Sequence, residues 1–277
     1  MNSLTSMQVQ PSDMAISRLS RHFLPIALAM AIAAIPTASA QMVVTYAEDS
    51  NSYVTTLTNT SMLTFDSLTA SAKATNVVWT DSTGTVGTID QVYIHAADQY
   101  GGAGASGSNY AVQSTTVGGT DATPVTTVNL TAPSAYFGMW WSAGDDKNVL
   151  KFYSGNTLVA QFTTSTLVNI ISSSPDYYGN PRTGQNASQP YAFINYYGQN
   201  GATWDKIVLT NQGTTGFESD NWTDRTGAWG TEPGETGPPP GVNVAIVNGT
   251  IVTPVPEPSV ISLLALLPLA AFRRRRE

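Results

Sequence analysis

Cysteine is absent from the 277 residues, and histidine occurs only twice. Without cysteine the chain cannot form a disulfide scaffold, a thiol nucleophile, a zinc finger or an iron–sulfur site. Basic residues are also scarce: 12 Lys and Arg against 19 Asp and Glu give a net charge of −7. Nucleic-acid binding needs a basic face, so this class of partner is excluded. The 42% of hydrophobic residues suffices for a packed core, while 11% of charged residues predicts a polar, largely uncharged surface.

The N-terminal segment 1–40 has the three parts of a secretory signal peptide. Arg18 and Arg21 form a positive region, Phe23–Ile35 is an almost uninterrupted apolar run, and Ala38 and Ala40 match the small-x-small cleavage pattern. We therefore expect a signal peptidase to remove residues 1–40 during export. The alternative, a buried helix, leaves the cleavage pattern unexplained.

The C-terminal segment 254–277 has a second three-part pattern. It comprises a Pro-Glu-Pro motif, an apolar stretch over 260–272 and a cluster of arginines: Pro256, Glu257, Pro258, Arg273, Arg274, Arg275 and Arg276. As a helix, the apolar stretch would extend about 20 Å, short of the roughly 30 Å of a bilayer's hydrocarbon core. Such a helix could hold the chain at a membrane transiently. The arginines would stay cytoplasmic, which places the exported body on the outer side.

This order of Pro-Glu-Pro, short apolar helix and arginine cluster resembles the PEP-CTERM sorting signal of bacterial exosortase substrates. In that family a membrane protease is thought to cut near the Pro-Glu-Pro motif and to transfer the protein to the cell surface or the extracellular polymer. The resemblance therefore implies an exosortase-type protease as a partner and the cell surface or extracellular matrix as the destination. The alternative is an ordinary tail anchor, which would not need Pro-Glu-Pro.

The residues between these two signals favour strands and turns over helices, being rich in Thr, Ser, Val, Tyr, Asn and Gly. Apolar and polar residues alternate in ten segments that we expect to be strands: 75–79, 86–94, 110–117, 125–130, 135–141, 149–153, 158–162, 191–197, 204–209 and 217–222. The turn at Ser154-Gly155-Asn156 predicts a hairpin, and 166–171 predicts a short helix. With no βαβ rhythm, residues 41–226 are expected to form an all-β, antiparallel, jelly-roll-like β-sandwich.

A Gly- and Pro-rich stretch over 227–241 follows the predicted sandwich. Its composition predicts a loop or linker that does not pack. Residues 242–252 alternate again and predict either a last strand or a stalk, so 227–253 would connect the body to the sorting signal.

Three parts of the body carry a second resemblance: Phe137–Ser142, the hairpin over 149–162 and Phe217–Asn221. Together they resemble a recurrent body of exosortase-sorted surface proteins, which is similar to lectin-like and carbohydrate-binding sandwiches. The resemblance implies extracellular polysaccharide as a partner, and it brings no characterised activity with it.

Acidic and amide side chains in two segments are candidates for a structural calcium site. Glu218 and Asp220 would point to the same side of a strand, where uncompensated carboxylates need a cation or solvent. Ca²⁺ prefers hard oxygens from irregular loops, and the Gly-rich loop after Asp98 could supply them. The expected ligands are Asp98, Asn109, Glu218, Asp220 and Asn221. The alternative is that all five are solvated loop and turn residues, because no EF-hand spacing is present.

Aromatic residues are numerous, and their faces can stack on the C–H surfaces of sugars. The segment 174–190 is the expected exposed binding loop, with Tyr177, Tyr178 and Arg182 as candidate ligand-binding residues. An ordinary long connection is the alternative. A further acidic pair, Asp145-Asp146, is interpreted as an exposed hairpin turn.

These observations predict an exported, non-enzymatic surface or matrix protein with a structural or glycan-binding β-sandwich and no required cofactor. Two alternatives stay open. A secreted carbohydrate-active enzyme would need two carboxylates about 5–10 Å apart in a cleft. An adhesin would need a large exposed apolar patch.

Overall fold

The computed structural model describes residues 41–104, 106–171, 174–247 and 250–253. The predicted signal peptide, with its cleavage residues Ala38 and Ala40, lies outside this part of the chain, and so does the predicted sorting signal at 254–277. Within the described residues, no helix is both long enough and apolar enough to cross a membrane.

Strands dominate the described part of the chain. The elements are β1 (Gln41–Tyr46), β2 (Ser61–Leu63), β3 (Ala72–Asp81), β4 (Gly84–His95), β5 (Tyr110–Gln113), η1 (Gly119–Asp121), β6 (Val125–Ser134), β7 (Tyr136–Ser142), β8 (Asn148–Ser154), β9 (Thr157–Thr163), α1 (Thr164–Ile171), η2 (Pro175–Tyr177), β10 (Ala192–Gln199), β11 (Trp204–Asn211), β12 (Phe217–Arg225), β13 (Val242–Val247) and β14 (Thr250–Thr253).

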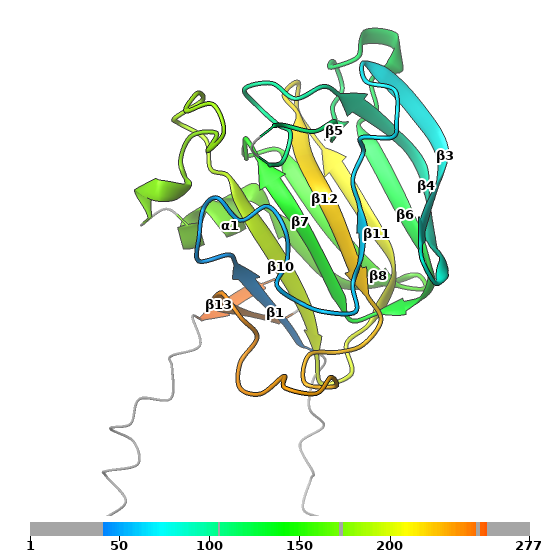
Figure 1. Cartoon of the computed structure of the whole chain (residues 1–277), viewed down its shortest axis with the longest axis vertical. Coiled ribbons are helices and arrows are strands. Elements are labelled where there is room, and N and C mark those ends of the chain that lie inside the picture. The colour runs from blue at the N-terminus through cyan, green and yellow to red at the C-terminus, as the bar shows by residue number, and fades with distance from the viewer. Residues whose placement is uncertain (1–40, 105, 172–173, 248–249, 254–277) are drawn as a thin grey trace, which may run out of the picture. The chain divides into compact units, whose positions relative to one another are not determined.

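All of the strands belong to one antiparallel sheet. Its order is β14-β13-β1-β10-β7-β12-β5-β4-β6-β11-β8-β9, with β2 paired to β12 and β3 paired to β4. The sheet curls until β10, β7 and β12 face β8, β11 and β6 across a shared core, almost closing into a barrel (Figure 1). The prediction of an all-β, antiparallel fold is therefore confirmed.

Aromatic rings from facing strands fill the core. Phe152 of β8 packs against Trp204 of β11 with ring centroids 4.8 Å apart, and Tyr196 of β10 lies 5.2 Å from Phe152. Phe137 of β7 packs edge-on against Trp222 of β12 in the same cluster. Because each large apolar side chain contributes about 1.5–3 kcal/mol when it is buried, this cluster supplies much of the stability of the curled sheet.

A second apolar cluster lies on the outer face of the same strands. Successive side chains of a strand alternate between faces, so Trp141 enters the core while Trp140 points outward. There Trp140 packs with Tyr191 and Phe193, and the ring of Tyr53, from the loop after β1, lies 5.2 Å from it. Loops thus cover the outer face of β10, β7 and β12, which leaves all seven residues of β7 buried.

Each of the ten predicted strands is present, with ends shifted by a few residues. The segment predicted over 110–117 ends at Gln113 because the hydroxyl of Ser114 accepts the amides of Thr116 and Val117, which turns the chain. The hairpin around Gly155 and the helix near 166–171 are confirmed, and 242–252 contributes β13 and β14. Strands β1 and β2 are additions that the alternation did not predict.

The prediction that 227–241 does not pack was wrong. It is a loop, but Glu235 accepts a bidentate ion pair from Arg225 at the end of β12, with Nη2 and Oε2 2.9 Å apart. The ring of Trp229 also packs edge-on against Tyr197 of β10. The physical reason is electrostatic: the guanidinium of Arg225 is buried and needs a counter-charge, which the linker provides.

Candidate functional site

The outer face of β12 carries two buried carboxylates. Phe217 and Trp222 face the core, and Ser219 accepts a hydrogen bond from the indole of Trp222 there. Glu218 and Asp220 alternate with Phe217 and Ser219 and therefore lie together on the outer face, where Asp220 is opposite Trp140 of β7. An irregularity between Asp220 and Thr223 returns Trp222 to the core. The sequence predicted that the two carboxylates share one side. The covering loops leave only 7% of Glu218 and 0% of Asp220 exposed. A buried acid needs hydrogen-bond partners or a proton, and the two acids differ in which of these they have.

Asp220 serves as a strut between β12 and the loop after β4. Its Oδ2 accepts hydrogen bonds from the amide of Ala103, at 2.9 Å, and from the hydroxyl of Ser108, while Oδ1 accepts the amide of Asn221 at 2.7 Å. Burial raises the pKa of Asp220 to about 6, although these hydrogen bonds favour the charged form. These hydrogen bonds therefore attach the loop to the strand, and Ala103 packs beside them in the outer apolar cluster.

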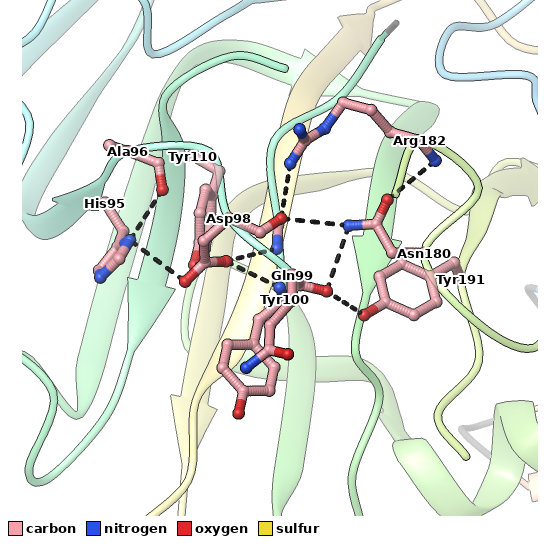
Figure 2. Close-up of polar contacts among 10 residues, drawn as sticks. His95, Ala96, Asp98, Gln99, Tyr100, Tyr110, Asn180, Arg182 and Tyr191 are labelled. Carbon is pink, nitrogen blue, oxygen red and sulfur yellow. Dashed lines mark hydrogen bonds and ion pairs between the residues drawn. The ribbon is translucent and has the colours of Figure 1, made fainter. Parts of the chain in front are cut away.

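Asp98 organises that loop from within (Figure 2). Its Oδ1 accepts the amide of Tyr100 at 2.7 Å, the amide of Gly101 at 3.2 Å and the hydroxyl of Tyr110 at 3.0 Å. Its Oδ2 lies 3.8 Å from Nδ1 of His95. A carboxylate with this many donors fixes the turn on which Tyr100 is carried.

The predicted binding loop over 174–190 is attached to this turn (Figure 2). Arg182 donates to the carbonyl of Asp98 at 2.6 Å, Asn180 donates to the carbonyls of Asp98 and Gln99 at 3.3 and 3.2 Å, and Tyr191 donates to the carbonyl of Gln99 at 2.8 Å. The two loops therefore form one hydrogen-bonded cover over β12.

The two tyrosines of the predicted binding loop differ in their exposure to solvent. Tyr177 is buried: its ring packs edge-on against Tyr46 at 5.2 Å, and its hydroxyl donates to the carbonyl of Ala47. Its face is not free to stack on a sugar. Tyr178 is half-buried and lines a separate, open pocket beside Tyr177 and Asn180.

Glu218 lines a pocket of about 230 Å³. Among the described residues no side chain or amide of another residue forms a hydrogen bond with its carboxyl group. Burial, followed by the charges of Asp145 and Asp98, raises its pKa well above the usual value, which favours the protonated acid. The lining residues are Tyr100, Val117, Ala143, Asp145, Gln189, Thr215, Gly216 and Glu218.

Gly216 leaves room for the carboxyl group of Glu218. A Cβ atom at position 216 would overlap that carboxyl, so a larger residue there would force the Glu218 side chain to move. Tyr100 is 42% exposed and presents an aromatic ring beside the acid. A protonated carboxyl can both donate and accept a hydrogen bond, and an adjacent ring offers an apolar face. This combination suits a small ligand that carries hydroxyl groups.

The residues predicted to bind calcium are not gathered around one point. Asn109 donates to the carbonyl of Leu68 at 3.0 Å, and its amide donates to Asp66 at 3.0 Å, whereas Asp98 and Asp220 satisfy different donors of the loop. The side chain of Asn221 donates to the carbonyl of Tyr53 at 2.8 Å. No group of three or more acidic or histidine side chains is arranged to hold a metal ion within the described ranges. Calcium binding by these residues stays a prediction.

Sequence reasoning did not predict the residues that line this pocket with Glu218. Tyr100 was not among the candidate ligand-binding residues, Asp145 was interpreted as part of an exposed turn, and Gln189 was not considered. No local pattern identifies these residues, because their proximity to Glu218 arises from the way separate loops fold over β12.

The chain matches no protein-family model, no curated protein and no solved structure.

Proposed function

We propose that this chain is an exported, non-catalytic protein that is sorted to the cell surface or extracellular matrix, where its body binds glycan. The sorting part of the proposal is supported by the order of Pro-Glu-Pro, apolar stretch and arginine cluster in 254–277. The binding part is supported by the pocket that Glu218 and Tyr100 both line. Within this proposal the curled sheet is a jelly-roll-like sandwich of the carbohydrate-binding type.

The size and chemistry of the pocket favour a single sugar unit. Its volume of about 230 Å³ is below the roughly 300–1,000 Å³ of sites for drug-sized ligands. A sugar ring presents hydroxyl groups along its edge and C–H bonds on its face. Glu218 and the amide of Gln189 would pair with hydroxyl groups, while Tyr100 would cover the face. The pocket would therefore take one residue of a polysaccharide.

Titration of the exported protein with a panel of mono- and oligosaccharides tests the binding proposal. We expect saturable heat with at least one sugar, weakened about 2- to 13-fold by Tyr100→Ala, because aromatic packing contributes about 0.5–1.5 kcal/mol. Glu218→Ala should abolish the heat. Asp146→Asn, an exposed substitution outside the pocket, is the matched control and should bind as the unaltered protein does. Absence of binding across the panel would contradict the proposal.

Fractionation of cells tests the sorting proposal separately. The unaltered chain should be found at the cell surface or in the matrix, in a form shortened near Pro256. A chain that lacks residues 254–277 should be exported but not retained. Finding the unaltered chain in the cytoplasm with its arginine cluster attached would contradict both export and sorting.

A carbohydrate-active enzyme is the second candidate, and one observation favours it. Glu218, whose pKa is raised, lines the same pocket as a second carboxylate, Asp145. Glycosidases use a protonated acid beside an ionised one. Release of a chromophore from aryl glycosides, abolished by Glu218→Gln, would support this candidate and refute the non-catalytic proposal.

A further inference from the structure

A second pocket lies at the opposite end of β12, and its lining is rich in oxygen atoms. Its volume is about 420 Å³, and it is bounded by the β3–β4 turn, β2, β6 and the end of β12. The lining includes Ser61, Asp81, Thr83, Thr85, Thr131 and Asp224. None of these residues belongs to the glycan pocket or to the calcium ligands that the sequence predicted.

Strand pairing brings two carboxylates to the same side of this pocket. Asp224 of β12 pairs directly with Ser61 of β2, and residues that face each other in an antiparallel pair project to the same face. The hydroxyl of Ser61 donates to Oδ2 of Asp81. Ser61 therefore connects Asp81, through its hydroxyl, with Asp224, its partner across the strands, although 143 positions separate the two acids in the sequence.

Asp81 is held in place as an anion. Its Oδ1 accepts the amide of Thr83 at 2.7 Å, the hydroxyl of Thr83 at 2.6 Å and the amide of Gly84 at 3.1 Å. The hydrogen bonds from Ser61 and Thr83 lower its pKa to about 2. The β3–β4 turn thus keeps a permanent negative charge beside the pocket.

Asp224 lacks a comparable set of donors. It is 4% exposed, and its Oδ1 is buried with no hydrogen-bond partner among the described residues. Burial, with a smaller contribution from the charge of Asp81, raises the pKa of Asp224 to about 7. Hydrogen bonding by the hydroxyl of Ser134 and by the amide of Arg225 opposes this shift. A buried oxygen without a partner costs about 1–3 kcal/mol, and more when it is charged. A partner from outside the chain would remove this cost.

The neighbouring base does not supply that partner. Arg225 lines the pocket, but alternation sends its side chain to the other face of β12. There its guanidinium is paired with Glu235 and donates to the carbonyl of Ala228 at 3.2 Å. Its charge is therefore already neutralised, and the two carboxylates of the pocket have no counter-charge among the described lining residues.

We propose that this pocket binds one divalent cation, Ca²⁺, through the carboxylates of Asp81 and Asp224 and the hydroxyl oxygen of Ser61. Ca²⁺ accepts a variable number of hard oxygen ligands and completes its shell with water, which fits an irregular site formed by a turn and two strands. Mg²⁺ demands a regular octahedron, which strands with fixed register do not readily provide. The ion would connect β2, the β3–β4 turn and β12.

Only two carboxylates contribute, so the affinity is expected in the range of extracellular calcium modules, with a dissociation constant of about 10⁻⁴–10⁻³ M. The site would be filled where calcium is millimolar and empty where it is scarce. Calcium would then stabilise the fold through its preferential binding to the native state.

Thermal unfolding of the full chain, first freed of metal with a chelator and then titrated with CaCl₂ at pH 8, tests the site. We expect a melting temperature about 3–6 °C higher at ten times the dissociation constant. Asp224→Asn should abolish this increase while it preserves side-chain volume. Asp81→Asn, an independent variant at the surface of the turn, should weaken calcium binding at least tenfold. Asp146→Asn serves as the exposed-acid control.

The outcomes separate this site from the one predicted by the sequence. An increase that disappears in Asp224→Asn or Asp81→Asn and persists in Asp98→Asn supports the proposal. An increase that persists in both of the first two variants, or disappears in Asp98→Asn alone, overturns it in favour of the loop. No change in melting temperature up to 20-fold above about 10⁻³ M CaCl₂ also overturns it.

Discussion

Removal of the Asp220 carboxylate should detach the loop after β4 from β12, and the loss of stability should depend on pH. Asp220→Ala leaves the amides of Ala103 and Asn221 without their acceptor, while the hydroxyl of Ser108 keeps the carbonyl of Ala103 at 3.2 Å. Each unsatisfied buried donor costs about 1–3 kcal/mol. At pH 4, where the native carboxyl is protonated, we therefore expect the free energy of unfolding to fall by about 2–5 kcal/mol.

At pH 8 the same substitution should cost less. The pKa of Asp220 is raised from 3.8 to about 6 in the folded protein, so keeping it ionised at pH 8 destabilises the unaltered chain relative to pH 4. One pKa unit corresponds to about 1.4 kcal/mol, and linkage over this interval gives a difference of about 2 kcal/mol. The Asp220→Ala variant has no carboxyl group to ionise at this position. The free energy of unfolding that it loses should therefore be about 2 kcal/mol smaller at pH 8 than at pH 4.

Urea unfolding at both pH values, in the presence of a chelator, measures the difference. Hydrogen exchange of the Ala103 amide provides a local readout, because its protection should fall in Asp220→Ala. Asp146→Ala, which removes an exposed acid, is the matched control and should change neither quantity. Equal losses at pH 4 and pH 8, together with unchanged protection of Ala103, would refute the argument that this carboxylate is a buried strut.

Other predictions concern the whole chain, the linker and the loop. Without metal ions, the stability of the folded protein should fall as the pH rises from about 4 to about 7. Burial raises the pKa values of Asp220 and Glu218, so the folded state binds protons more tightly than the unfolded state. Melting temperatures that rise over this pH interval would contradict the prediction. Arg225→Met should destabilise the fold by about 3–5 kcal/mol by leaving Glu235 unpaired, and should open 227–241 to proteolysis, whereas Arg225→Lys should lose less. Gly101→Ala places a Cβ atom 2.5 Å from a buried tyrosine ring and should cost about 1–3 kcal/mol in urea unfolding; an unchanged midpoint would show that the ring moves aside freely.

The fold was predictable to the extent that it depends on local alternation. Segments such as 86–94 and 204–209 alternate clearly, and they became β4 and β11. Strand β2 has three residues, too few for a periodic pattern, and it forms because it pairs with the end of β12. The sequence also could not show that the sheet would almost close on itself, because pairing between β4 and β6 or β1 and β10 joins distant segments.

The candidate site was predictable in part for the same reason. Alternation placed Glu218 and Asp220 on one side of a strand, and the structure has them there. Alternation cannot predict how closely the loops pack over the outer face of that strand. The sequence therefore could not distinguish an acid that is satisfied by loop amides from one that opens into a pocket. Asp224 was not predicted as a metal ligand for a related reason, since its surroundings come from β2 and the β3–β4 turn.

The pairing of β1 with both β10 and β13 has a mechanical consequence. Residues after Thr253 continue from β14, which pairs with β13 alone and has no neighbour on its other side among the described strands. Tension applied through the C-terminal end would therefore reach this peripheral hairpin first and peel it from β1 a few hydrogen bonds at a time. The hairpin would therefore separate from β1 before the aromatic core was disrupted, so this edge of the sheet would yield first under load.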